Sequence, residues 1–162
     1  MPKKKKIINE EITYLVCINK EEYSKVAVSF AYKLAKRNNG RITLLNVIEP
    51  SDYQSFGAVA DKMQEEMRKE TEELFQQMSD EITSDGGNVP ILIVKEGRIE
   101  EEIINVVEED PMIRMIIVGT ATESSVKSKV LPPLVTQIGN KLLIPMLIVP
   151  GNLTDQQIDS LT

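Results

Sequence analysis

Apolar residues occur along the chain in two alternating patterns. Five short, almost uninterrupted apolar runs lie at residues 12–18, 41–50, 89–94, 115–119 and 145–150, and each has the length of a strand buried on both faces. Between these runs, apolar residues recur every three or four positions, as they do on the buried side of a helix. This alternation predicts an α/β fold, with a five-stranded parallel sheet sandwiched by helices.

The predicted helices are marked by where their apolar stripes begin and end. The first runs from Tyr23 to Ala35 and is stopped by Asn-Asn-Gly, in which Gly40 suits a left-handed cap. A loop at 51–57 precedes a long charged helix over about 58–85. The apolar stripe of that helix is predicted at Val59, Met63, Met67, Leu74, Met78 and Ile82; those of the two later helices are predicted at Ile99, Ile103, Ile104 and Val107 and at Leu134, Val135, Ile138 and Leu142.

The same pattern divides the chain into three parts. Residues 1–10 form a basic tail that contains four consecutive lysines, and residues 11–150 form a single domain. Residues 151–162 form a second tail. Thr154 followed by Gln157 is the spacing of a capping box, so this tail is predicted to end in a short helix.

Composition excludes several classes of function. The chain contains no histidine, which removes Ser-His-Asp and Cys-His catalysis and most zinc sites, and we expect no catalytic or metal site. Its net charge of −6 disfavours nucleic acid and anionic membranes as partners. The single cysteine, Cys17, lies in an apolar run and is expected to be a buried thiol in a reducing cytoplasm.

A ligand of such a sheet would bind beyond the carboxyl ends of its strands, where the strand order switches. The predicted strands at 12–18, 41–50 and 115–119 end at this edge, and each brings candidate residues to it. Glu49 and Asp52 follow the second of these strands; they are Mg²⁺ ligands on one interpretation and ordinary loop residues on the other. The candidate crevice residues are Cys17, Ile18, Asn19, Val47, Val118 and Gly119.

The segment "VGTATESSVKSKVLPPLV", residues 118–135, leaves the fourth strand and enters a helix. Its small, hydroxylated and basic residues are typical of phosphate loops, and Thr122, Ser124, Lys127 and Lys129 are its candidate ligand contacts. The alternatives are a solvated loop without a ligand and a loop that has lost an earlier phosphate site.

Several segments together resemble the universal stress protein family. They are "YLVCINKEEYSKVAVSFAYKLAK", "ITLLNVIEP", "EGRIEEEIINVVEE", "MIIVGT" and "IPMLIVP", and the resemblance extends over most of the chain. It implies a Rossmann-like sheet of the adenine nucleotide α-hydrolase type. It also implies a cytoplasmic homodimer with a role in stress survival, in a family with one ATP-binding branch and one that does not bind ATP.

The ATP-binding branch carries a motif of Gly, two residues, Gly, nine residues, Gly and then Ser or Thr. Placed on this chain without gaps, only Gly119 matches, because Thr122, Pro132 and Pro133 stand at the other three positions. Asn19 stands where the family has an aspartate, while Val47 matches the valine that lines the adenine slot. The two prolines have no N–H to donate to phosphate, so weak or absent ATP binding is predicted.

Two functions remain open at this point. The first is a non-catalytic stress-response protein that acts as a homodimer with unnamed protein partners and without a cofactor. The second is a nucleotide-binding sensor that takes ATP with Mg²⁺ and hydrolyses it slowly. In either case the fifth strand is predicted to be an unguarded sheet edge that pairs with a second copy. The predicted dimer contacts are Pro145, Met146, Leu147, Ile148 and Val149.

Overall fold

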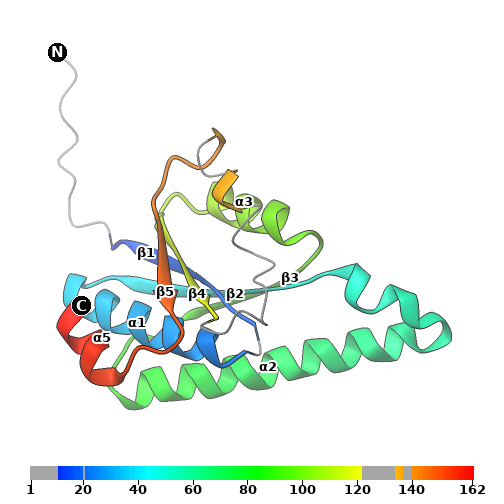
Figure 1. The fold of residues 1–162 in the computed structure, drawn as a ribbon, viewed down its shortest axis with the longest axis horizontal. Coiled ribbons are helices and arrows are strands. Elements are labelled where there is room, and N and C mark those ends of the chain that lie inside the picture. The colour runs from blue at the N-terminus through cyan, green and yellow to red at the C-terminus, as the bar shows by residue number, and fades with distance from the viewer. Residues whose placement is uncertain (1–10, 20, 122–133, 137–139) are drawn as a thin grey trace.

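The computed structural model describes residues 11–19, 21–121, 134–136 and 140–162. Within these residues, five strands form one parallel sheet in the order β3-β2-β1-β4-β5, which confirms the predicted architecture (Figure 1). The strands are β1 (Thr13–Cys17), β2 (Arg41–Ile48), β3 (Ile91–Glu96), β4 (Ile113–Thr120) and β5 (Met146–Pro150).

Helices cover both faces of this sheet. In Figure 1, α1, α2 and α5 lie on one face and α3 lies on the other. Each face has its own hydrophobic core, and the two cores are separated by the sheet. The helices are α1 (Glu22–Asn38), α2 (Ala60–Ser84), α3 (Ile99–Glu109) and α5 (Asp155–Leu161).

Strand β1 is central and contributes to both cores. Tyr14 and Val16 pack in the core beneath α1 and α2, whereas Leu15 and Cys17 pack in the core beneath α3. All five residues of the strand are buried. Successive side chains of a strand point to opposite faces, so an uninterrupted apolar run is the sequence that a doubly covered strand requires.

Strand β3 differs from its prediction in both position and burial. It begins at Ile91 instead of residue 89, because Pro90 has no N–H to donate to the ladder with β2. Ile91 and Leu92 are 43% and 40% exposed, so the prediction of full burial is wrong here. The reason is that β3 is an edge strand, with a paired neighbour on one side only.

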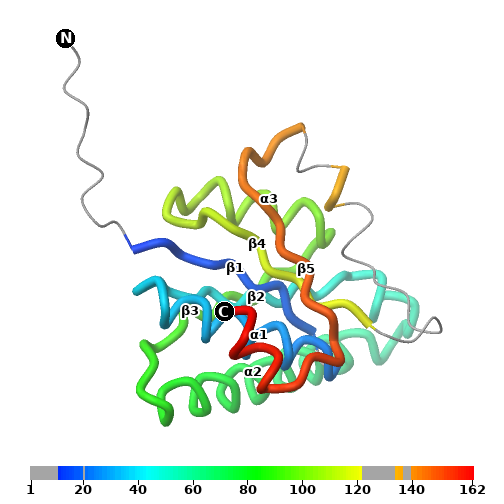
Figure 2. Tube along the Cα trace, turned by 60° about the vertical axis from the view of Figure 1, so that its left-hand side comes forward, coloured from blue at the N-terminus to red at the C-terminus, as the bar shows by residue number. Residues whose placement is uncertain are grey.

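The predicted loop at 51–57 contains two short 3₁₀ helices, Pro50–Asp52 and Gln54–Val59, which lead directly into α2. Figures 1 and 2 show that this segment and the first turns of α2 extend beyond the sheet. Val59 is therefore exposed. Its place in the predicted apolar stripe required it to face a core, so the prediction is wrong at this residue. The residues of α2 that are buried all come from its later turns: Thr71, Phe75, Met78, Ser79 and Ile82.

The end of α1 is capped by a different residue from the one predicted. Asn39, with φ 52°, takes the left-handed conformation that was assigned to Gly40. Gly40 is needed for space instead, because a Cβ there would lie 2.8 Å from the carbonyl oxygen of Ile12. The capping box of Thr154 and Gln157 at the start of α5 is confirmed.

Two further expectations concern the remaining elements. Residues 134–136 are helical and Leu134 and Leu142 are buried as predicted, but Val135 is 54% exposed and Ile138 lies outside the described residues. None of the helices described is long and apolar enough to cross a bilayer.

Candidate functional site

A cavity of about 710 Å³ lies at the carboxyl ends of β1, β2 and β4. The sheet places β2 and β4 on opposite sides of β1, so the strand order reverses at this point, where α/β sheets bind ligands. We call this cavity the crevice. Its size lies within the range of sites for small organic ligands. All six predicted crevice residues in the described part of the chain line it, namely Cys17, Ile18, Asn19, Val47, Val118 and Gly119.

The predicted loop residues and dimer residues have different outcomes. Thr122, Ser124, Lys127 and Lys129 lie outside the described residues, as do Pro132 and Pro133. The predicted dimer residues lie in or next to β5, the last strand at one edge of the sheet. Pro145 directly precedes the strand, and Met146, Leu147, Ile148 and Val149 belong to it. Of these, Ile148 is 46% exposed and Val149 is buried.

Asn19 follows β1, and both the oxygen and the nitrogen of its side-chain amide form hydrogen bonds. Its Oδ1 accepts from the backbone N–H of Glu21 (2.9 Å) and from Oγ of Ser24 (2.8 Å). Its Nδ2 donates to the hydroxyl oxygen of Tyr23 (2.8 Å), and its backbone N–H donates to Ser24 Oγ (3.0 Å). The amide therefore links the end of β1 to the first turn of α1.

Asn46 holds α2 against the end of β1. Its Nδ2 donates to the carbonyl oxygen of Ile18 (2.8 Å), and its Oδ1 accepts from the hydroxyl of Thr71 on α2 (3.2 Å). The site prediction missed both residues. A signal was available, since Asn46 interrupts the apolar run of β2 and Thr71 lies four residues after the predicted stripe residue Met67.

The helix α2 supplies one wall of the crevice. Its lining residues are Met67, Glu70, Thr71, Glu73, Leu74 and Gln77. Two contacts to Glu96, at the end of β3, hold this helix in place: Arg68 forms an ion pair with Glu96 Oε1, and Gln64 donates to Glu96 Oε2 (2.6 Å). The wall is therefore tied to the sheet from both Asn46 and Glu96.

Glu49 accepts a hydrogen bond from the backbone N–H of Ile99 (3.3 Å) at the start of α3. A carboxylate at this position also interacts favourably with the helix dipole. Glu49 thus has a structural role, and Asp52, the other candidate Mg²⁺ ligand, lines the crevice. In the described residues, His, Cys, Asp and Glu side chains do not gather in any group of three that could hold a metal ion.

Gly119, at the end of β4, lies directly against the first turn of α1. A Cβ at this position would stand 2.5 Å from the carbonyl oxygen of Tyr23, closer than real Cβ contacts. Gly151, just after β5, is similar, with 2.6 Å from its Cβ position to Cβ of Tyr23. The glycine that matches the phosphate motif is therefore required by packing, whether or not phosphate binds.

Cys17 lines the crevice but is poorly suited to act as a nucleophile. Its side chain is only 9% exposed, and desolvation by burial raises the pKa of the thiol to about 12. Because the thiolate is the reactive form, this cysteine is a neutral part of the crevice wall near neutral pH. The expectation of a buried thiol is confirmed.

Comparison with known proteins decides the family. The family model described as "Universal stress protein family" matches residues 13–150. The chain belongs to the universal stress protein family.

Solved structures of universal stress proteins share this fold. One is the universal stress protein UspA from Lactobacillus plantarum, with a TM-score of 0.69 at 18% identity, covering 87% of this chain and 99% of that one. Another is a protein of the family from Burkholderia pseudomallei, with a TM-score of 0.66 at 19% identity and coverage of 85% and 95%. No curated protein matches the chain.

A third universal stress protein was solved in complex with cAMP. Its structure has a TM-score of 0.58 at 15% identity, and the match covers 87% of this chain and 98% of that one. At such identities these likenesses concern the fold. In this chain the side-chain amide of Asn19, at the edge of the crevice, forms hydrogen bonds with Glu21, Tyr23 and Ser24.

The packing of Gly119 gives a first prediction. Gly119→Ala should lower the free energy of unfolding by about 1–3 kcal/mol, because the added methyl group forces β4 away from α1. Urea denaturation of the protein without nucleotide measures the loss. Thr120→Ala, one residue along the same strand, is the control and should have the smaller effect. A Gly119→Ala variant as stable as the wild type would show that the two segments separate easily.

The raised pKa of Cys17 gives a second prediction. With a pKa of about 12, about one thiol in ten thousand is ionised at pH 8, whereas an ordinary cysteine is ionised to a tenth or more. Alkylation by iodoacetamide should therefore be at least about a thousandfold slower in the folded protein than in denaturant. Mass spectrometry gives both rates without ambiguity, because the chain has a single cysteine. Rapid alkylation of the folded chain would contradict the assignment.

Proposed function

We propose that this universal stress protein is a non-catalytic stress-response protein that acts as a cytoplasmic homodimer and binds ATP weakly or not at all. Unidentified protein partners would transmit its effect. The observation that carries the proposal is the hydrogen bonding of the Asn19 side chain at the edge of the crevice. Its amide is already bonded to Glu21, Tyr23 and Ser24, so binding a sugar or phosphate through it would break contacts with α1.

The chemistry of the glycine motif supports weak ATP binding. Backbone N–H groups at the start of a helix are the usual donors to phosphate, and Pro132 and Pro133 have none. Each charge-assisted hydrogen bond that is missing costs about 1.5–3 kcal/mol, so two of them reduce affinity by about a hundredfold or more. Thr122 replaces a further glycine.

The absence of a suitable reacting group supports a non-catalytic role. The chain has no histidine, and the thiol of Cys17 is protonated at neutral pH because its pKa is about 12. The lining carboxylates of Glu70 and Glu73 lie on the exposed side of α2, and the chain has no histidine to act with them. Acid and base catalysis needs groups with adjusted pKa values in a shared geometry.

A second candidate function is a nucleotide-binding sensor with slow ATPase activity. The observation that favours it is the crevice itself, since a cavity of about 710 Å³ at the switch point is large enough for a nucleotide. Val47 lines it at the position of the family's adenine-slot valine. A universal stress protein with a similar fold was solved with cAMP.

The homodimer is proposed from the edge strand β5. An uncovered apolar edge is a risk of aggregation unless it is paired, and no charged residue occurs between Pro145 and Pro150 to prevent pairing. Ile148 is 46% exposed, whereas Leu147 packs against the core beneath α1. Antiparallel pairing of two copies about a two-fold axis would satisfy the free backbone groups of both.

The third prediction concerns ATP. Titration calorimetry with Mg-ATP at tens of micromolar should detect no binding, because two phosphate donors are replaced by proline. The triple variant Thr122→Gly/Pro132→Gly/Pro133→Ser restores the family motif and should tighten binding at least about tenfold. Submicromolar affinity of the wild type would instead favour the nucleotide sensor, and Lys127→Ala and Lys129→Ala should then weaken it more than changes at distant lysines.

The fourth prediction concerns the dimer. Light scattering should give about twice the chain mass of 18.2 kDa, and Ile148→Lys should shift the protein towards monomer by placing two charges in the interface. Leu92→Lys is the matched control, because it places the same charge at a similarly exposed position on β3, the opposite edge of the sheet. A monomeric wild type at tens of micromolar, or dissociation only by Leu92→Lys, would contradict pairing through β5.

A further inference from the structure

The described walls of the crevice carry negative charge and no positive charge. Of the described residues that line it, four have carboxylates, and none is lysine or arginine. Glu21 precedes α1, Asp52 follows β2, and Glu70 and Glu73 come from α2. A phosphate group brought against these walls would meet like charges, while an ammonium group would meet opposite ones.

Glu70 and Glu73 occupy the same flank of α2. With Gln77 they follow the helical spacing beside Met67, Thr71 and Leu74, which line the crevice on the apolar side of that flank. In the described part of the chain, the side chains of Glu70, Glu73 and Gln77 take part in no hydrogen bond or ion pair. Both carboxylates are exposed and have no neutralising partner among the described residues, so they give this part of the crevice mouth a negative charge.

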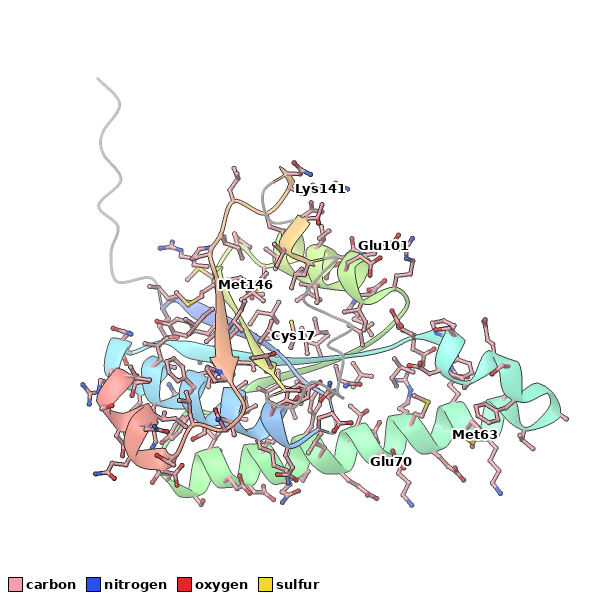
Figure 3. All side chains as sticks on the ribbon, in the orientation of Figure 1. Cys17, Met63, Glu70, Glu101, Lys141 and Met146 are labelled. Carbon is pink, nitrogen blue, oxygen red and sulfur yellow. The ribbon has the colours of Figure 1, made fainter. Side chains whose placement is uncertain are left out.

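The interior of the crevice is neutral and largely apolar. Ile18, Leu45, Ile103 and Val118 line it together with Cys17, which is more than nine-tenths buried. The Cys17 thiol faces the crevice and has no hydrogen-bond partner among the described residues. Cys17, at the end of β1, packs in the core beneath α3, whereas Glu70 lies on α2 on the other side of the sheet, and both are labelled in Figure 3. The crevice thus joins a neutral interior to an acidic rim.

We propose that the crevice binds an organic cation of nucleoside size, with a neutral ring system in the apolar interior and a protonated amino group at the rim formed by Glu70 and Glu73. This inference deepens the proposed function and rests on its assignment of the crevice as the ligand site. It accounts for the weakness towards ATP through repulsion at the rim, in addition to the lost phosphate donors. The cavity of about 710 Å³ suits a ligand of this size.

Three compounds that share the adenosine ring system and differ only at the 5′ position test the effect of ligand charge. At that position 5′-amino-5′-deoxyadenosine carries a positive charge, adenosine carries no charge, and AMP carries a negative charge. Calorimetric titration of the full chain at low ionic strength should rank them in that order. The amine should bind at least about tenfold more tightly than AMP, and added salt should narrow the difference.

Variants of α2 test whether the rim is responsible. Glu70→Gln/Glu73→Gln should reduce the ratio of amine to AMP affinity at least about threefold and leave adenosine unchanged. Glu65→Gln/Glu72→Gln removes the same charge from exposed positions of α2 that do not line the crevice, so its ratio should stay near that of the wild type. Thermal unfolding of each variant verifies that it is folded.

The outcomes are distinct from those that test the proposed function. Failure of all three compounds to bind, or tighter binding of AMP than of the amine, overturns the inference. So does an unchanged ratio in Glu70→Gln/Glu73→Gln, or an equal change in the control variant. The Mg-ATP titration and the light-scattering mass are read separately, so the non-catalytic homodimer stands or fails on its own measurements.

Discussion

The close approach of Tyr23 to the ends of β4 and β5 is the constraint on which the crevice depends. The first turn of α1 can lie across both strand ends only because Gly119 and Gly151 have no Cβ. This contact places the start of α1 beside the switch point of the sheet, and Asn19 then bonds to Tyr23 and Ser24. The position of one crevice wall therefore follows from steric exclusion at two glycines.

The polar groups around the crevice serve the fold before they serve a ligand. Asn19 joins β1 to α1, Asn46 joins β1 to α2, and Glu49 caps α3. Hydrogen bonds of this kind cost free energy when they are broken, so a ligand gains little by competing for them. Among the described residues, the carboxylates of Glu70 and Glu73 at the rim on α2 are left for recognition. This division of roles is the physical basis of the weak phosphate binding proposed above.

The sequence predicted the sheet and the crevice better than it predicted the surroundings. The runs of β1 and β4 are buried on both sides, and such runs have one interpretation, so Cys17 and Gly119 were placed correctly at the strand ends. The residues of a single strand do not show whether it lies at the edge or in the middle of a sheet. The exposure of Ile91 on the edge strand β3 was therefore not predicted. The role of Asn46 depends on Thr71, which lies 25 residues away, and local pattern does not report such pairs. The loop residues from Thr122 onward lie outside the described residues, so their contacts stay a prediction.

The helix α2 is anchored unevenly along its length. Its buried residues run from Thr71 to Ile82, whereas its earlier turns are held mainly by Gln64 and Arg68 through Glu96. Segments with few buried contacts open at a lower free-energy cost than the global unfolding of a domain. We therefore expect the first half of α2 to open at a lower free-energy cost than the sheet. Access to the crevice would then depend on a helix-to-coil equilibrium set by the few contacts at Glu96, and a destabilising change there would alter ligand exchange rates before it altered the melting temperature.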